Sequence, residues 1–230
     1  TDYLICQNKY ATATGLSDMV DGEISHDKVT RFLRQGDFDS KMLWKHVKPA
    51  VRDRETQNGV LILDDSIEDK PYTDENEVNC WHYSHAKGDV VKGINFLSCM
   101  VRYDDFSLPI GYEIIKKDIE YSDIKTQKLR RKATVNKNQH FRQLIQQACT
   151  NHVLFEWVLA DNWFGSKANM EFIHDELQKS FIIGVKSNRT LALSEDDAKN
   201  GRHQQVRLLE LEEDVVHKAW LKGLAFPVQL

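Results

Sequence analysis

Two aspartates directly follow short apolar runs, at positions where carboxylates could bind a divalent metal. Apolar residues 60–63 lead into Asp64, and residues 158–160 lead into Asp161. Continuous apolar runs of this length are typical of strands buried on both faces of a helix-covered sheet. The carboxyl ends of parallel strands share one edge of such a sheet, where α/β proteins place their sites. Because Mg²⁺ prefers carboxylate oxygens and promotes phosphoryl transfer, Asp64 and Asp161 are the candidate metal ligands and catalytic residues.

The pattern around the two aspartates predicts the sheet that would bring them together. Phe141, Leu144, Ile145 and Ala148 recur at helical spacing, and Ser166 can cap a second helix. With these helices, the predicted order is strand, strand, strand, helix, strand, helix, strand. This is the order of an RNase H-like α/β fold, in which a mixed sheet is flanked by helices. The predicted strands are 60–63, 90–101, 107–115, 153–160 and 181–185.

Two parts of this core are expected to be less regular. Residues 66–89 are polar and predict a long connection after the first strand. Within the predicted strand 107–115, Pro109 and Gly111 indicate an irregular strand or one near the edge of the sheet.

The first 58 residues contain a predicted helical module. Ser25 is a good N-cap for a helix whose apolar side would carry Val29, Phe32 and Leu33. A helix, a tight turn and a capped second helix are typical of a helix-turn-helix, although any helical hairpin shows the same pattern. The exposed groups of this module that could contact DNA include His26, Lys28 and Arg31.

Beyond residue 187 the alternation of strands and helices stops. Short strand-like pieces at 191–193, 206–211 and 215–221, separated by polar links, indicate the start of a β-strand insertion. The predicted organisation is a helical DNA-binding module and lead-in at 1–58, an RNase H-like catalytic core at 59–187 and the start of the insertion at 188–230.

Charge is unevenly distributed along the chain. The net charge of −4 excludes an evenly basic protein that coats DNA. Positive charge is concentrated between residues 116 and 142, where it could neutralise phosphates, although an isolated charge run is more often a solvated, mobile loop. The candidate DNA contacts in this stretch are Lys128, Arg130, Arg131 and Lys132.

The composition is ordinary for a globular protein, with 41% hydrophobic and 29% charged residues. No apolar run is long enough to span a bilayer, and the start of the chain lacks a signal peptide pattern. The four scattered cysteines suit reduced thiols better than a disulfide framework, which favours a cytoplasmic location.

Several motifs resemble those of bacterial insertion-sequence transposases of the DDE class, in the subgroup whose core is split by a β-strand insertion. The resemblance covers most of the chain, and residues 12–33 also look like the helical DNA-binding start of such proteins. Its most specific pieces are Leu61-Ile62-Leu63-Asp64-Asp65-Ser66, Trp81-His82-Tyr83-Ser84-His85 with Lys92-Gly93-Ile94-Asn95, and Leu159-Ala160-Asp161-Asn162-Trp163-Phe164-Gly165-Ser166.

The resemblance implies roles for the two aspartates. In that family the first catalytic aspartate follows the first strand and has Ser or Thr two positions later, which fits Asp64 with Ser66. Asp65 is the alternative. The second catalytic aspartate ends the fourth strand, which is Asp161 here. The third acid is a glutamate in a Tyr…Arg…Glu…Lys signature that this sequence lacks, so the chain is expected to stop before it.

The resemblance also implies a cofactor and partners. Two Mg²⁺ or Mn²⁺ ions would be shared by the catalytic carboxylates. The partners would be the inverted repeats at the transposon ends and the target DNA, and the complete protein would act as a homodimer. The expected location is the bacterial cytoplasm, at the nucleoid when the protein is bound to DNA, with no membrane partner.

An aromatic segment follows the first aspartate. Trp81, His82 and His85 could position DNA by stacking or phosphate contact. Packing of Trp81 beneath the long connection is equally compatible with the sequence. Trp163 and Phe164, in contrast, are expected to pack against the protein and not to contact DNA.

Three functions fit these observations. The first is a DDE transposase that cuts and rejoins DNA by metal-dependent phosphoryl transfer. The second is a catalytically inactive, DNA-binding remnant of such a transposase. The third is an unrelated RNase H-like nuclease, which would cut DNA without preference for terminal repeats.

Overall fold

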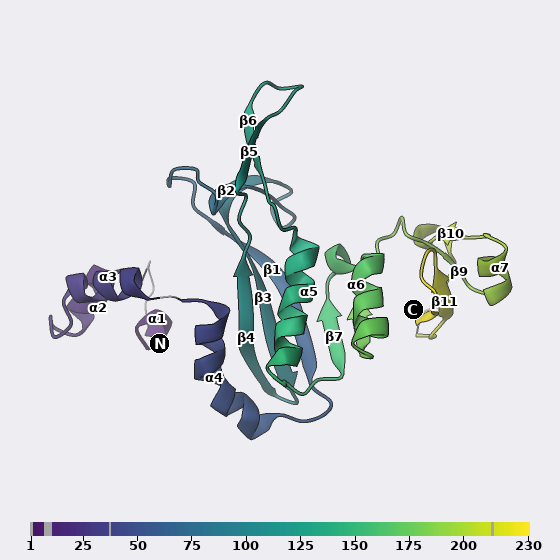
Figure 1. Ribbon diagram of the computed structural model, residues 1–230, viewed down its shortest axis with the longest axis horizontal. Coiled ribbons are helices and arrows are strands. Elements are labelled where there is room, and N and C mark those ends of the chain that lie inside the picture. Colours follow the sequence, from purple (N-terminus) through teal and green to yellow (C-terminus); the bar gives the residue numbers. More distant parts are fainter. Residues whose placement is uncertain (1, 7–10, 37, 213) are drawn as a thin grey trace. The chain divides into compact units, whose positions relative to one another are not determined.

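The computed structural model describes residues 2–6, 11–36, 38–212 and 214–230. The chain divides into two compact units, Thr1–Met42 and Leu43–Leu230. The larger unit holds the central sheet (Figure 1). In the described ranges, no helix is long and apolar enough to cross a membrane.

The described part of the smaller unit contains the short helices α1 (Asp2–Cys6), α2 (Ala13–Met19) and α3 (His26–Gln35). Ser25 caps α3 as predicted, because its hydroxyl accepts a hydrogen bond from the backbone N–H of Lys28 at 3.4 Å. The predicted apolar side of α3 is not buried, since Phe32 and Leu33 are 60% and 59% exposed. The 7 residues of α2 offer too little surface to cover it.

The larger unit is built on a six-stranded mixed sheet. Its strands are β1 (Val60–Asp69), β2 (Asn79–Ser84), β3 (Asp89–Tyr103), β4 (Phe106–Ile114), β7 (Trp157–Ala160) and β8 (Ser180–Ile183). β3 pairs antiparallel with β1 on one edge and with both β2 and β4 on the other. β7 runs parallel to β1, and β8 runs parallel to β7. This strand order confirms the predicted RNase H-like α/β fold.

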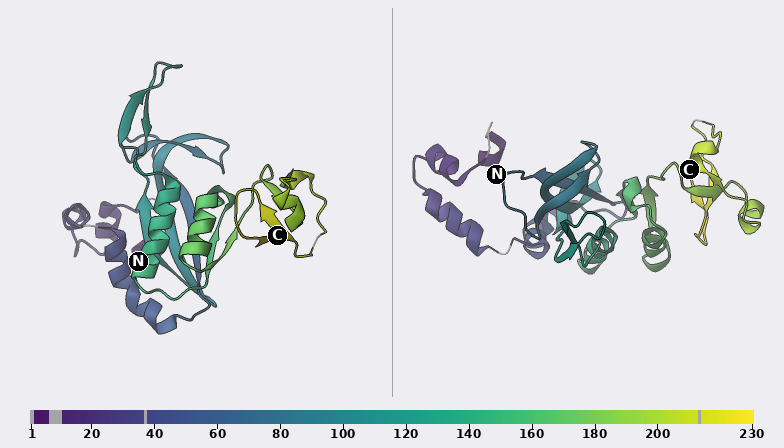
Figure 2. Two further views of the ribbon diagram at one scale, coloured as in Figure 1. Left: turned by 45° about the vertical axis from the view of Figure 1, so that its right-hand side comes forward. Right: turned by 90° about the horizontal axis from the view of Figure 1, so that it is seen from above.

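Helices cover the sheet and complete its core (Figures 1 and 2). α5 (Lys137–Thr150) packs beside α6 (Lys167–Glu171), which continues as the π-helix η2 (Phe172–Glu176). α4 (Ser40–Arg54) adds Trp44 and Val51 to the same core. The four apolar residues predicted from helical spacing are the buried residues of α5, namely Phe141, Leu144, Ile145 and Ala148.

The edge strand β4 is irregular, as its proline and glycine predicted. Cys99 of β3 faces Gly111, whereas Met100 faces Pro109, so Ile110 is an extra residue on β4. The register shift forms a β-bulge, which bends and twists a strand locally. Pro109 occupies this position because a proline has no N–H to donate to a ladder.

Part of the basic stretch forms a β-hairpin. β5 (Ile119–Ser122) pairs antiparallel with β6 (Leu129–Lys132). Asp123 closes the turn between them, because its Oδ1 accepts from the backbone N–H groups of Lys125 and Thr126 at 3.1 and 2.8 Å. Residues 119–132 are therefore paired strands joined by a turn, and most of the residues in these two strands are exposed.

The C-terminal segment forms a second, four-stranded sheet in the order β10-β9-β11-β12. Its elements are β9 (Thr190–Ala192), α7 (Glu195–Lys199), β10 (Gln204–Gln205), β11 (Lys218–Leu221) and β12 (Val228–Gln229). The predicted strand at 206–211 is wrong, since Val206–Leu208 form the 3₁₀ turn η3. The backbone N–H groups of Val206 and Arg207 donate to the carbonyls of Arg189 and Ser187, so no strand partner takes them.

Candidate active site

Asp64 and Asp161 occupy equivalent positions on two neighbouring parallel strands. Leu63 of β1 is in register with Ala160 of β7, and each aspartate is the next residue of its chain. Side chains of successive strand residues point to opposite faces of a sheet. Leu63 and Ala160 are buried on one face, so the carboxylates of the next residues, Asp64 and Asp161, point toward the other face. The structure therefore brings together the two residues that the sequence singled out.

The two strands end differently around this pair. Asp64 lies inside β1 and not past its end, because residues 64–69 continue to pair with residues 93–98 of β3. β7 stops at Ala160, and Asp161 caps the 3₁₀ turn η1 (Asn162–Phe164) by accepting the Trp163 N–H at 2.9 Å. Both Asp64 and Asp161 are exposed.

The Asp64 carboxylate is held in a partly desolvated, negatively charged environment. Burial raises its pKa above the ordinary value of 3.8, and the charges of Asp65 and Asp161 raise it further. The backbone N–H of Asp65, which donates to Asp64 Oδ1 at 2.9 Å, and the charge of Lys137 act in the opposite direction. A group with this environment favours a bound cation, which would relieve the repulsion.

The metal-free Asp64→Asn variant is expected to be more stable than the parent chain at neutral pH. The raised pKa of Asp64 means that its ionised form costs folding stability above that pKa. Below 3.8 the group is protonated in both the folded and the unfolded state, so the advantage should vanish. Urea unfolding in a chelator at neutral and acidic pH measures the difference. Equal stabilisation at both pH values would contradict an electrostatic cause.

Asp65, the alternative first ligand, points to the face of β1 opposite to that of Asp64, and its carboxylate already accepts hydrogen bonds from other side chains. Its Oδ2 accepts from Lys137 Nζ at 2.6 Å and from Asn95 Nδ2 at 3.2 Å. The side chains of Asp65 and Lys137 are only 18% and 23% exposed. Asp65 therefore fixes the start of α5 against the sheet, and the geometry favours Asp64 as the ligand.

A double-mutant cycle on Asp65 and Lys137 is expected to give a coupling energy of about 1–3 kcal/mol in the free energy of unfolding. Either Asp65→Asn or Lys137→Met alone leaves a partly buried charge without its partner. The exposed pair of Glu195 and Lys199, at 2.7 Å, is the control and should couple by less than about 0.5 kcal/mol. Equal coupling energies in the two pairs would show that burial does not strengthen the ion pair between Asp65 and Lys137.

The two aromatic residues after Asp161 behave differently. Phe164 is fully buried and stacks on Phe141, with ring centroids 4.7 Å apart. Trp163 is 41% exposed, so it packs only in part. The ammonium groups of Lys137 and Lys186 lie 5.3 and 5.0 Å from the Trp163 ring centroid. The sequence pattern did not reveal this arrangement, because the two lysines come from segments far apart along the chain.

The aromatic segment after the first aspartate lies in β2 and alternates in exposure. His82 is buried beside Cys80, with Sγ and Nε2 3.3 Å apart, and burial lowers the pKa of His82 to about 4. Because His82 is only 6% exposed, little of its ring is accessible to a phosphate, and its contact with DNA stays a prediction. Trp81 is 50% exposed, and its Nε1 donates to Glu75. His85 is exposed and lies 6.0 Å from Trp163 between ring centroids, so it reaches the candidate site.

The cations of the β5–β6 hairpin are largely matched by carboxylates or aromatic rings. Arg131 pairs with Glu120 and Glu75, and Arg130 lies 3.5 Å from Asp123. Lys132 Nζ lies 5.6 Å from the centroid of the Tyr121 ring. Lys128 is exposed in the turn. The hairpin carries much less unpaired positive charge than the sequence indicates.

The predicted DNA contacts of the smaller unit lie together on α3. His26, Lys28 and Arg31 are all exposed. His26 Nε2 lies 3.3 Å from Asp27 Oδ1, and Arg31 Nε donates to the Asp27 carbonyl at 3.5 Å. Their contact with DNA stays a prediction.

The paired carboxylates fit a divalent cation that DNA itself would help to coordinate. Mg²⁺ is commonly held by one or two carboxylates together with substrate phosphates and water. In the part of the chain that the structure describes, no group of three or more His, Cys, Asp or Glu side chains could hold a metal. The donor set of Asp64 and Asp161 thus matches one ion completed by substrate.

The fold and the paired acids define an RNase H-like α/β protein with a carboxylate site where β7 ends beside β1. A model of the family described as DDE superfamily endonuclease matches residues 1–219, and the chain belongs to this family. No curated protein matches it. A chain described as "Drosophila P element transposase strand transfer complex" is similar at 9% identity and a TM-score of 0.28, over 82% of this chain. This chain spans about half of that one, with 47% covered.

Proposed function

We propose that this DDE superfamily endonuclease is a transposase that cuts and rejoins DNA at the ends of its mobile element. The observation that carries the proposal is the register of β1 and β7, which puts Asp64 and Asp161 side by side. Neither the strand order nor the apolar core requires two acids at these positions. Their mutual repulsion, which contributes to the raised pKa of Asp64, is a cost that a cation would remove.

Asp64 and Asp161 would hold Mg²⁺ or Mn²⁺ at this position. When bound, such an ion lowers the pKa of an attacking water or 3′-hydroxyl and stabilises charge on the scissile phosphate. The bond from the Trp163 N–H holds the Asp161 carboxylate in one orientation. Lys137, fixed by Asp65, adds a positive charge that acts on Asp64 and would favour an approaching phosphate.

The test is a cleavage assay that compares three DNA duplexes. Two are copied from the left and right flanks of the encoding locus, and the third is a scrambled duplex of equal length. The 230-residue chain is incubated with each duplex in Mg²⁺, in Mn²⁺ and in a chelator. Metal-dependent nicking confined to the flank duplexes, with joining of the released 3′ ends, is the expected result.

Two other outcomes would replace the proposal. Equal metal-dependent cutting of all three duplexes would make the chain an RNase H-like nuclease without end specificity. Binding of the flank duplexes without cutting in either metal would make it a DNA-binding protein that lacks catalytic activity.

A further inference from the structure

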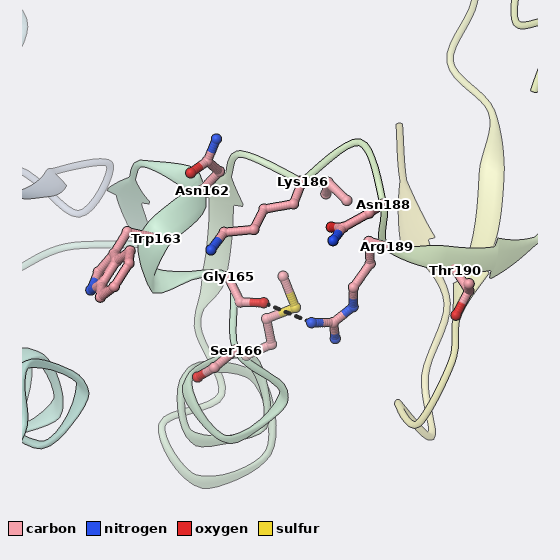
Figure 3. Close-up of a pocket in the computed structure, with 10 residues that line it drawn as sticks. Asn162, Trp163, Gly165, Ser166, Lys186, Asn188, Arg189 and Thr190 are labelled. Atoms are coloured by element: carbon pink, nitrogen blue, oxygen red, sulfur yellow. Dashed lines mark hydrogen bonds between the residues drawn. The ribbon is translucent and has the colours of Figure 1, made fainter. Parts of the chain in front are cut away.

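A pocket of about 330 Å³ opens beside the candidate active site and has no assigned role (Figure 3). It lies between the turn that follows Asp161 and the link from β8 to β9. Asn162, Trp163, Lys186, Asn188 and Arg189 line it. Its size is at the lower end of the range for small-ligand sites, so it suits one nucleotide and not a duplex.

The lining of the pocket is cationic and aromatic. Among the described residues that line it, none is acidic, so the lining offers no carboxylate to Lys186 or Arg189. Arg189 Nη1 donates to the Gly165 carbonyl at 3.0 Å, which orients the guanidinium and uses one of its five N–H donors. Figure 3 shows the Lys186 ammonium group directed toward the Trp163 ring. A ligand with a flat ring and a phosphate matches this combination.

We propose that the pocket receives one unstacked nucleotide of the DNA strand that is being cut, with its base on Trp163 and its phosphate on Lys186 and Arg189. The proposal rests on the proposed function for the identity of the ligand. Asn162 directly follows Asp161, so the pocket begins one residue away from a candidate metal ligand. If the scissile phosphate of a DNA strand lies at Asp64 and Asp161, a neighbouring nucleotide of the same strand would therefore lie in the pocket.

The lysines beside Trp163 do not prevent such binding. A cation–π contact at an exposed ring is weaker than a charge-assisted hydrogen bond to phosphate. Lys186 can therefore exchange the ring for the phosphate and release the ring face for stacking. Lys137 is held in place by Asp65 and keeps the positive charge at the edge of the pocket. Base stacking on an aromatic side chain is tolerant of sequence, so the pocket would not select one base strongly.

The test is the affinity of the full chain for a short, fluorescently labelled single strand, measured by anisotropy in a chelator so that metal binding plays no part. Trp163→Leu is expected to weaken binding about tenfold, and Trp163→Phe to retain most of the affinity. Lys186→Gln should weaken binding and reduce the slope of log affinity against log salt concentration by about 0.7. Circular dichroism checks that each variant is folded.

Matched controls are available within the chain. Trp157→Leu removes an indole that is 39% exposed, close to the 41% of Trp163, but lies at the opposite end of β7. Lys218→Gln removes an ammonium group 5.3 Å from the centroid of another tryptophan ring, that of Trp220. Both controls should bind the single strand as the parent chain does.

The outcomes separate this proposal from the proposed function. If Trp163→Leu binds no more weakly than Trp157→Leu, the nucleotide pocket is wrong, whether or not the chain cuts DNA. If a free mononucleotide competes as well as the single strand does, the pocket is a site for small nucleotides and the strand proposal is overturned. If the Trp163 effect is seen but no metal-dependent cleavage occurs, the pocket stands and the transposase proposal fails.

Discussion

Replacing Asp161 with alanine is expected to weaken Mn²⁺ binding by at least roughly a hundredfold and to abolish metal-dependent DNA cleavage. Loss of residues that merely support metal ligands already costs about 10–100-fold in affinity or activity. Asp161 would itself supply half of the protein carboxylates at the site, in register with Asp64 across β1 and β7. Asp64→Ala should have the same effect. Isothermal titration with Mn²⁺ in the presence of a short duplex measures the affinity.

Asp105→Ala is the control for this prediction. Asp105 is an exposed carboxylate in the turn from β3 to β4, and the register of β1 with β3 places that turn near Val60, where β1 begins, whereas Asp64 lies in the middle of β1. This variant should bind Mn²⁺ as the parent chain does. If Asp161→Ala also binds Mn²⁺ with parental affinity, the metal site has been assigned to the wrong residues. If Asp65→Asn removes metal binding while Asp64→Ala does not, the first ligand is Asp65.

Phe164→Ala is expected to destabilise the larger unit by about 3–5 kcal/mol. Phe164 and Phe141 are both 0% exposed, and their rings stack at 4.7 Å with an interplanar angle of 15°. Truncation therefore removes buried apolar surface, opens a cavity and ends an aromatic contact. Urea unfolding followed by circular dichroism gives the change in the free energy of unfolding.

The same experiment on Tyr72→Ala provides the reference, since Tyr72 is 100% exposed and should change stability by less than about 0.5 kcal/mol. A similar, small effect of Phe164→Ala would contradict the packing seen between α5 and η1. Because Phe164 belongs to the turn that Asp161 caps, the variant should also bind Mn²⁺ less tightly than the parent chain at temperatures where it is still folded.

Much of the core could be predicted because its signals are local and repeated. The spacing of Phe141, Leu144, Ile145 and Ala148 fixes which side of α5 is buried. The apolar runs before Asp64 and Asp161 identify central strands, and the order of elements then implies that these strands are parallel neighbours. Pro109 and Gly111 correctly marked an irregular edge strand.

The remaining features depend on contacts between distant segments, which no local pattern contains. β1 extends to Asp69 because β3 is long enough to pair with its polar half. His82 is buried because it faces inward in β2, a strand that the polar residues around it concealed. Trp163 is exposed between Lys137 and Lys186, which the fold brings to it from α5 and from the link after β8. In the hairpin at 119–132, Arg131 forms an ion pair with Glu120 of the facing strand. The composition of this stretch does not reveal which residues face each other.

The irregular strand β4 has a consequence for the behaviour of this protein in concentrated solution. An open sheet edge is a template on which the strand of another molecule can add, and long runs of such additions lead to aggregates. Pro109 withholds one donor from that edge, and the extra residue Ile110 breaks the regular spacing of the others. Two molecules that meet along β4 would find mismatched hydrogen-bonding groups, so this edge of the sheet is a poor template for adding a strand.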